Sequence, residues 1–140
     1  MRLINCDFSN AVLRGFEARR VEFLDCRLIG MRAIECRWDD VLVERCDARY
    51  AQFRDGHLRT CEFRGSHLGE CDLAGADLAA TRFANVMLQR ADLTGAKLRG
   101  ADLRGADIEG VALRAEDAEG AIVSAAQAMD LARLLGLIIR

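Results

Sequence analysis

Every fifth residue from Leu3 to Val123 is apolar, with no insertion or deletion along the run. A period of five fits neither an α-helix, at 3.6 residues per turn, nor a flat strand, whose side chains alternate with a period of two. Self-similarity at a fixed period is the signature of a repeat architecture. The pattern is most regular over residues 91–110, where four successive units each read small, polar, large apolar, polar, glycine.

A second rule concerns the residue two places before each central apolar residue, which is almost always small or compact. Cysteine fills this position six times, at Cys6, Cys26, Cys36, Cys46, Cys61 and Cys71. Glu116 is the only charged residue that the register places there. Two inward residues in every five, at spacings of two and then three, predict a chain that turns a corner once per unit.

Four such corners close a square, so the pattern predicts a four-sided solenoid in which each coil pairs with the coils above and below it. Nine of the 12 glycines occupy the fifth position of the unit, where a corner is most easily made by a residue that tolerates unusual dihedral angles. We expect about six coils and, at about 4.8 Å between paired strands, a rod roughly 30 Å long.

The units Ala76-Asp77-Leu78, Ala91-Asp92-Leu93 and Ala101-Asp102-Leu103 closely resemble the repeat of the pentapeptide-repeat family, A[D/N]LXX. The resemblance covers residues 1 to about 123, although the first half keeps the apolar phase and varies the other positions. It implies an all-β solenoid, a right-handed quadrilateral β-helix. A weaker resemblance points to the fluoroquinolone-resistance branch of the family, whose members bind DNA gyrase.

A different pattern begins after the repeat, so we predict two regions, residues 1–123 and residues 124–140. Ser124 and Gln127 have the spacing of a capping box, and residues 125–135 are rich in strong helix formers. Gly136 is placed to end this helix, and residues 137–139 are expected to form a short β segment. The helix would cover the last coil, which a solenoid needs.

The apolar C-terminus also predicts contact with a partner, and the family resemblance implies a homodimer joined at this end. The residues expected to form the dimer contact are Leu131, Leu134, Leu135, Leu137, Ile138 and Ile139.

The cysteines and histidines, which often act in catalysis or metal binding, lie at positions unsuited to either role. All six cysteines occupy inward positions and their spacings differ from those of zinc sites, so we expect small buried side chains in a reducing compartment. His57 and His67 fall on opposite sides of the predicted square. No nucleophile, base and acid converge, and no phosphate-binding loop is present, so we expect no enzymatic activity, no cofactor and no metal.

The chain carries a net charge of −2, and no predicted side of the rod carries charges of a single sign. This balance favours neither nucleic acid nor membranes as direct partners, and no stretch is apolar enough to span a bilayer. We therefore expect a cytoplasmic protein.

A few outward positions are apolar, and most of them lie in the first three coils. Together with a collar of arginines in the second coil, they suggest a contact surface for a protein partner. The residues of this predicted surface are Leu24, Ile29, Ile34, Arg27, Arg32 and Arg37.

Two functions remain open at this level. The first is a non-enzymatic interaction or scaffold module with a protein partner. The alternative, implied by the resemblance alone, is a DNA mimic that binds DNA gyrase or topoisomerase IV and protects them from quinolones. DNA as long as a dimer of such rods carries roughly 35 phosphates, whereas two of these chains together carry a charge of only −4, twice the −2 of one chain.

Overall fold

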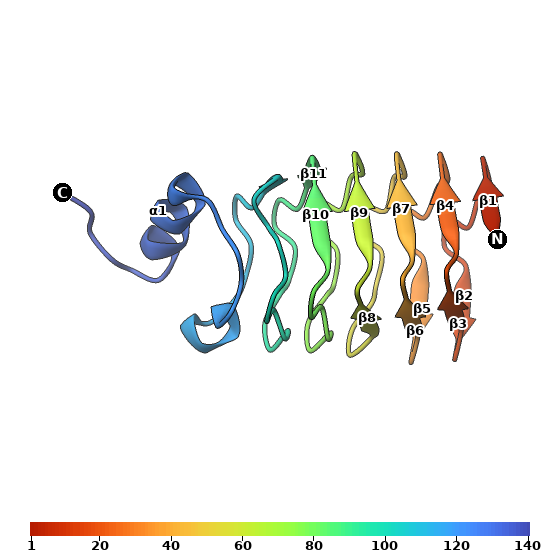
Figure 1. The fold of residues 1–140 in the computed structure, drawn as a ribbon, viewed down its shortest axis with the longest axis horizontal. Helices are drawn as coiled ribbons and strands as arrows, with labels where there is room; N and C mark the ends of the chain where they lie inside the picture. Colours follow the sequence, from red (N-terminus) through yellow and green to blue (C-terminus); the bar gives the residue numbers. More distant parts are fainter.

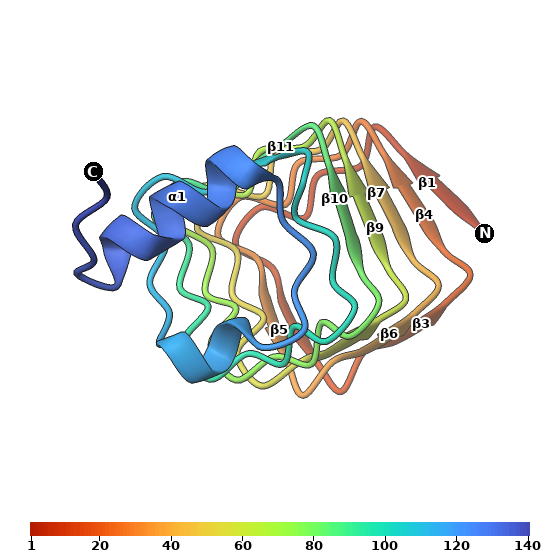
Figure 2. The same cartoon turned by 60° about the vertical axis from the view of Figure 1, so that its left-hand side comes forward.

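A computed structural model describes all 140 residues as a parallel β-solenoid closed at its C-terminal end by one α-helix (Figure 1). Residue i pairs with residue i + 20 throughout, as in Arg2 with Glu22 and Trp38 with Leu58. The predicted fold class is therefore confirmed. Figure 2 shows the four-sided outline of the coils, with the helix lying across the end.

Each side of the rod is one ladder of short parallel strands or single bridges. The first side is a five-stranded sheet: β1 (Arg2–Ile4), β4 (Glu22–Leu24), β7 (Leu42–Glu44), β9 (Glu62–Arg64) and β10 (Arg82–Ala84). The second side is a line of bridges through Asp7, Arg27, Asp47, His67 and Met87, ending in β11 (Val86–Met87) and β12 (Ala106–Asp107). The third side holds β2 (Val12–Arg14) and β5 (Arg32–Ile34), and the fourth holds β3 (Glu17–Arg19), β6 (Arg37–Asp39) and β8 (His57–Arg59). Bridges continue the first, third and fourth ladders toward the C-terminus.

The interior is one continuous core of 35 buried residues built from the two inward positions of each unit. The largest side chains in it are aromatic, with Trp38, Phe23, Phe53, Phe63 and Phe83 all almost fully buried. Because each coil packs only on its neighbours, stability is spread along the rod rather than gathered at one centre.

Side chains at the small inward position form hydrogen bonds as well as fitting into the limited space. The thiols of Cys26, Cys46 and Cys71 donate to the carbonyls of Leu3, Phe23 and Ala48 in the preceding coil, at 3.1, 3.3 and 2.9 Å. The Ser66 hydroxyl does the same toward Val43 at 3.3 Å. A small side chain with a weak donor fits this position because it fills little space and needs only one acceptor.

The corners place the backbone in the left-handed region, as the glycine pattern predicted. Fourteen corner residues other than glycine also adopt it, with φ between 51° and 60°. All of these residues have a Cβ, which disfavours this conformation, so the stacked ladders on either side must hold them there.

The last coil departs from the repeat. Residues Ala115–Ala118 form the 3₁₀ helix η1, which turns Glu116 out to solvent instead of placing it inward. The neighbouring Asp117 is buried and accepts hydrogen bonds from the Arg114 backbone N–H at 2.8 Å and the Arg114 guanidinium at 2.9 Å.

Helix α1 (Ala125–Leu134) begins at the predicted capping box. The Gln127 N–H donates to Ser124 Oγ at 3.2 Å, and the Ser124 N–H donates to Gln127 Oε1 at 3.0 Å. The helix ends where Gly136, with φ of 87°, allows its own N–H to donate to Arg133 and the Leu137 N–H to donate to Ala132.

The short β segment expected at residues 137–139 does not form within the single chain. Residues 137–140 follow the helix without any assigned strand, and Figure 1 shows them leaving α1 on the side away from the solenoid. A strand needs a neighbouring backbone for its hydrogen bonds, and the chain places none beside this segment.

Candidate interaction surface at the C-terminal end

The C-terminal end of the rod carries a cluster of exposed apolar side chains, which we call the C-terminal apolar surface. Its members are Met129, Leu134, Leu135, Leu137, Ile138 and Ile139, each at least 41% exposed, with Ile138 at 81%. They come from the last turns of α1 and the segment after it. An apolar cluster of this kind at the end of an otherwise polar rod is typical of an interaction site.

Five of the six residues predicted for the dimer contact belong to this surface, and Leu131 does not. Leu131 is half-buried and packs against the solenoid core, so it attaches the helix to the rod. Met129 joins the surface although the sequence analysis left it out. A helical pattern alone does not reveal which of its apolar residues the last coil covers.

Gln127 decides how the helix sits on the solenoid. Its side chain is buried, and Nε2 donates to the carbonyl oxygen of Ala106 at 2.8 Å and to that of Leu103. It thereby supplies a donor to the Ala106 carbonyl and a second donor to the Leu103 carbonyl, which already accepts from the Ala106 N–H at 2.9 Å. This contact holds α1 across the end of the rod, with Leu131 packed against the core and Met129, Leu134 and Leu135 partly exposed.

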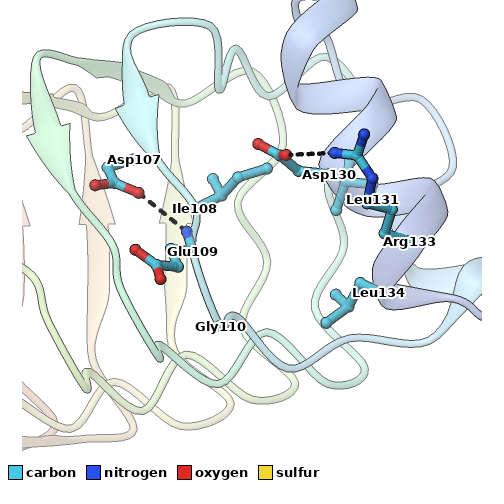
Figure 3. A pocket seen from close by; sticks show the side chains of 8 residues that line it. All are labelled: Asp107, Ile108, Glu109, Gly110, Asp130, Leu131, Arg133 and Leu134. Carbon is cyan, nitrogen blue, oxygen red and sulfur yellow. Dashed lines mark hydrogen bonds and ion pairs between the residues drawn. The ribbon is translucent and has the colours of Figure 1, made fainter.

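A groove of about 530 Å³ separates α1 from the last coil on the second side (Figure 3). Its lining combines apolar with charged residues: Asp107, Ile108, Glu109, Gly110, Asp130, Leu131, Arg133 and Leu134. A second hollow, lined in part by Met87 and Gln89, adjoins it at Glu109 and Gly110. The groove and this mostly polar hollow together border the C-terminal apolar surface on the second side of the rod.

The carboxylates around the groove differ in what they bind. Asp107 accepts from Gln89 Nε2 at 2.8 Å and from the Glu109 N–H at 3.1 Å. Asp130 lies 3.6 Å from Arg133 in an exposed ion pair. The Glu109 side chain has no hydrogen-bond or ion-pair partner within the chain, and Asp107 binds only neutral donors, so neither charge is neutralised by a cation of the chain.

The contact surface predicted in the second coil is not brought together by the structure. Leu24 lies on the first side, Ile29 on the second and Ile34 on the third, and all three are half-buried. Arg27, Arg32 and Arg37 are likewise on the second, third and fourth sides. Residues five apart in this fold always fall on adjacent sides, so a cluster in the sequence becomes a ring around the rod.

Most charges on the rod are paired with a charge in the same chain. Arg45 with Asp25, Arg90 with Glu70, and Arg99 with Glu119 are stacked directly across neighbouring coils, at 2.8, 2.8 and 3.2 Å. One full turn of the chain, from the third coil into the fourth, carries one arginine on each side, and each is within 4 Å of a carboxylate: Arg49, Arg54, Arg59 and Arg64. The surface therefore alternates in sign along the rod.

Five of the six cysteines are buried as predicted, and Cys6 in the first coil is half-buried. Burial raises the pKa of Cys36 to about 11 and those of Cys46 and Cys61 to about 12, so these thiols stay protonated at neutral pH. His57 belongs to the fourth ladder and His67 to the second, on opposite sides of the square. None of these side chains reaches the groove beside α1.

No helix of the structure has the length and apolar character needed to cross a membrane.

Comparison with known families identifies the repeat directly. A family model described as "Pentapeptide repeat region" matches residues 1–73, and one described as "Pentapeptide repeats (8 copies)" matches residues 61–100 and 71–110. A search of curated proteins found no match.

Solved structures of pentapeptide repeat proteins also match. The plasmid-mediated fluoroquinolone resistance protein QnrB1 is 20% identical, with 99% of this chain and 87% of that chain covered and a TM-score of 0.37. A protein from the thylakoid lumen of Arabidopsis thaliana is 25% identical, with 74% and 72% covered and a TM-score of 0.43. HetL of the cyanobacterium Nostoc, involved in the regulation of heterocyst differentiation, is 16% identical, with 79% and 82% covered and a TM-score of 0.32.

Proposed function

Because the chain belongs to the pentapeptide repeat family, we propose that it acts as a non-enzymatic protein-interaction and scaffold module. In this proposal the solenoid is a rigid spacer, and the C-terminal apolar surface joins two copies into a homodimer. The rod sides remain free to contact a protein partner.

The observation that carries the proposal is the exposure of the C-terminal apolar surface. Helix α1 buries Gln127 against the rod and leaves Met129, Leu134 and Leu135 over 40% exposed. Burying apolar area contributes about 25 cal/mol per Å², so an end of this composition gains stability when a second apolar surface covers it. A second copy offers the same surface, as an isologous dimer requires.

The rod itself supports a scaffold role. Its cysteines donate to backbone carbonyls inside the core, and most of its arginines are paired with carboxylates on adjacent positions. These side chains are thus engaged in holding coils together. An extended, stiff stack of this kind presents surface over a long distance without needing a concave catalytic site.

The charge pattern favours this function over a DNA mimic that binds gyrase or topoisomerase IV. A mimic of duplex DNA needs rows of negative charge along its length. Here acidic side chains alternate with arginines along a column, as in Glu70 with Arg90 and Arg99 with Glu119. A gyrase supercoiling assay with and without a quinolone tests the alternative: a change in supercoiling or in drug protection at micromolar protein would support it.

Sedimentation velocity over a range of concentrations tests the dimer. We expect the full-length protein to dimerise and the variant Ile138→Ser/Ile139→Ser to sediment as a monomer at the same concentrations. The matched control is Ile4→Ser/Val12→Ser, which changes two exposed apolar residues at the other end of the rod and should leave the dimer intact. A full-length chain that stays monomeric at all concentrations would refute the proposed dimer.

A further inference from the structure

Three cysteines are stacked in one column of the core at the N-terminal end of the rod. Cys6, Cys26 and Cys46 are 20 residues apart, which is one coil, so they occupy the same inward position in the first three coils. The residue after each cysteine pairs in register with the residue after the next one, as Asp7 does with Arg27. In every other column a cysteine has a different residue above and below it.

The hydrogen bonds of this column place each thiol beside the cysteine of the preceding coil. The Cys26 and Cys46 thiols donate to the carbonyls of Leu3 and Phe23, at 3.1 and 3.3 Å, and each of these carbonyls lies three residues before the next cysteine of the column. The Cys26 N–H donates to Cys46 Sγ at 3.4 Å. Paired strands lie about 4.8 Å apart, and disulfide-bonded cysteines have Cα atoms roughly 4.4–6.8 Å apart. The backbone spacing of stacked cysteines is therefore within the range that a disulfide spans.

The three thiols differ in their access to solvent. Cys26 and Cys46 are 2% and 3% exposed, whereas Cys6 is half-buried. Figure 1 shows the first coil at the end of the rod opposite α1, where it packs on only one neighbouring coil. The Cys6 thiol is also held weakly, because its contact with the Ile4 carbonyl is 3.6 Å long. Cys6 is thus the thiol of this column that a reagent in solution reaches first.

Burial makes the two inner thiols slow to react with such a reagent. It raises the pKa of Cys26 above its ordinary value and the pKa of Cys46 to about 12. Only the thiolate attacks a disulfide. A reaction of this column therefore begins at Cys6 and draws in Cys26, its one stacked neighbour.

We propose that Cys6 and Cys26 form a redox-active pair, which a low-molecular-weight disulfide such as oxidised glutathione converts into a disulfide that fastens the first coil to the second. The Cys6 thiolate attacks one sulfur of oxidised glutathione, which forms a mixed disulfide and releases one glutathione thiolate. The Cys26 thiolate then attacks Cys6 Sγ, and the second glutathione thiolate leaves. The two protein thiols give up two electrons and two protons, and one oxidised glutathione becomes two reduced glutathiones.

The bond joins the part of the solenoid that is packed least tightly. The inward side chains Leu3, Phe8 and Leu13 of the first coil are half-buried, whereas the same positions in the next coil are buried. A disulfide that closes a loop of one coil restricts the unfolded chain and opposes local opening of the first coil. This inference does not depend on the dimer proposed above.

Oxidation of the folded full-length protein by oxidised glutathione at pH 8 tests the pair. After free thiols are blocked, trypsin leaves each of the six cysteines in a different peptide, because arginines separate them all, so mass spectrometry identifies the linkage directly. We expect the intact protein to lose two hydrogen atoms and the peptides of Cys6 and Cys26 to be joined.

Serine variants separate the two steps of the reaction. Serine suits this column, because Ser66 occupies it one coil after Cys46 and donates to a carbonyl in the same way. Cys26→Ser should stop at one glutathione bound to Cys6, and Cys6→Ser should take up none. Cys61→Ser, which changes a buried cysteine of another column, is the matched control and should react as the parent does.

The same samples show whether the bond fastens the first coil. We expect the amides of residues 2–19 to exchange more slowly in the oxidised parent than in the reduced parent, and at one rate in Cys6→Ser under both conditions. Oxidation that leaves their exchange unchanged would refute the fastening. A parent that keeps only bound glutathione, joins a different pair of cysteines, or reacts only when unfolded in urea would overturn the redox pair itself.

Discussion

The indole ring of Trp38, in β6, stacks inside the core on the phenyl ring of Phe23, in β4, with ring centroids 5.2 Å apart and planes inclined by 18°. Trp38 also meets Phe16 and Phe53 edge-on, at 6.3 and 5.3 Å. It is fully buried, and its Nε1–H is the one buried side-chain polar group without a hydrogen-bond partner. The residue thus contributes much apolar contact and one unfavourable polar group.

Two replacements of Trp38 measure how much of this packing an aromatic ring keeps. We expect Trp38→Ala to lower the free energy of unfolding by about 3–5 kcal/mol, as for other large-to-small changes in cores. Trp38→Phe should cost clearly less, because it keeps an aromatic ring in the core. Both variants remove the unpaired N–H. Urea unfolding followed by circular dichroism measures both; equal losses for the two variants would show that the retained ring recovers none of the packing.

Gln127→Ala should detach helix α1 from the rod. The change removes the donor to Ala106 and Leu103 and the acceptor for the Ser124 N–H, at a cost of about 1–3 kcal/mol for each buried group left unpaired. We expect faster amide exchange across residues 125–134 while the earlier coils stay protected. Gln52→Ala, an exposed glutamine in the third ladder, should leave the exchange pattern as it is.

Residues 80 and 100 occupy the same corner in neighbouring coils, so substituting each compares alanine with glycine at this corner. Ala80 has φ of 59° and Gly100 has φ of 74°. A Cβ on Gly100 would come no closer than 3.7 Å to its neighbours, so Gly100→Ala should cost about 1 kcal/mol through its dihedral angles alone. Ala80→Gly should change stability by a smaller amount, because relief of strain is offset by the greater freedom of glycine in the unfolded chain. Thermal unfolding midpoints compare the two.

Acid should weaken the last full coil, because two of its carboxyl groups, Asp102 and Asp117, have strongly lowered pKa values. Hydrogen bonds from the Arg104 guanidinium lower the pKa of Asp102 to about 2, and those from Arg114 hold the pKa of Asp117 well below its usual range. A carboxylate whose folded pKa is depressed contributes stability above its unfolded pKa, near 4, and loses it as the pH falls toward the folded pKa.

The unfolding midpoint should therefore fall between about pH 4 and pH 2, and the decline should be shallower in the variant Asp117→Asn. A variant with the same slope as the parent protein would assign the acid sensitivity to other carboxylates.

The sequence alone determined the solenoid, its four sides and the register of its coils. A four-sided repeat of five residues returns to the same column every 20 residues. The apolar phase therefore also predicts that residue i pairs with residue i + 20, as Arg2 does with Glu22. The capping box at Ser124 and the end of the helix at Gly136 were equally predictable, because each depends on neighbours within a few residues.

The candidate site was decided by the tertiary structure. The partner surface predicted in the second coil stays a prediction, but neighbouring units lie on different sides of the rod, so Leu24, Ile29 and Ile34 form a ring around it rather than one patch. No pattern in the sequence predicts that the N–H groups of Ile108 and Gly110 lack hydrogen-bond partners. They are unpaired because α1 takes the place of the next coil, and only the placement of that helix decides which backbone groups lose their partners.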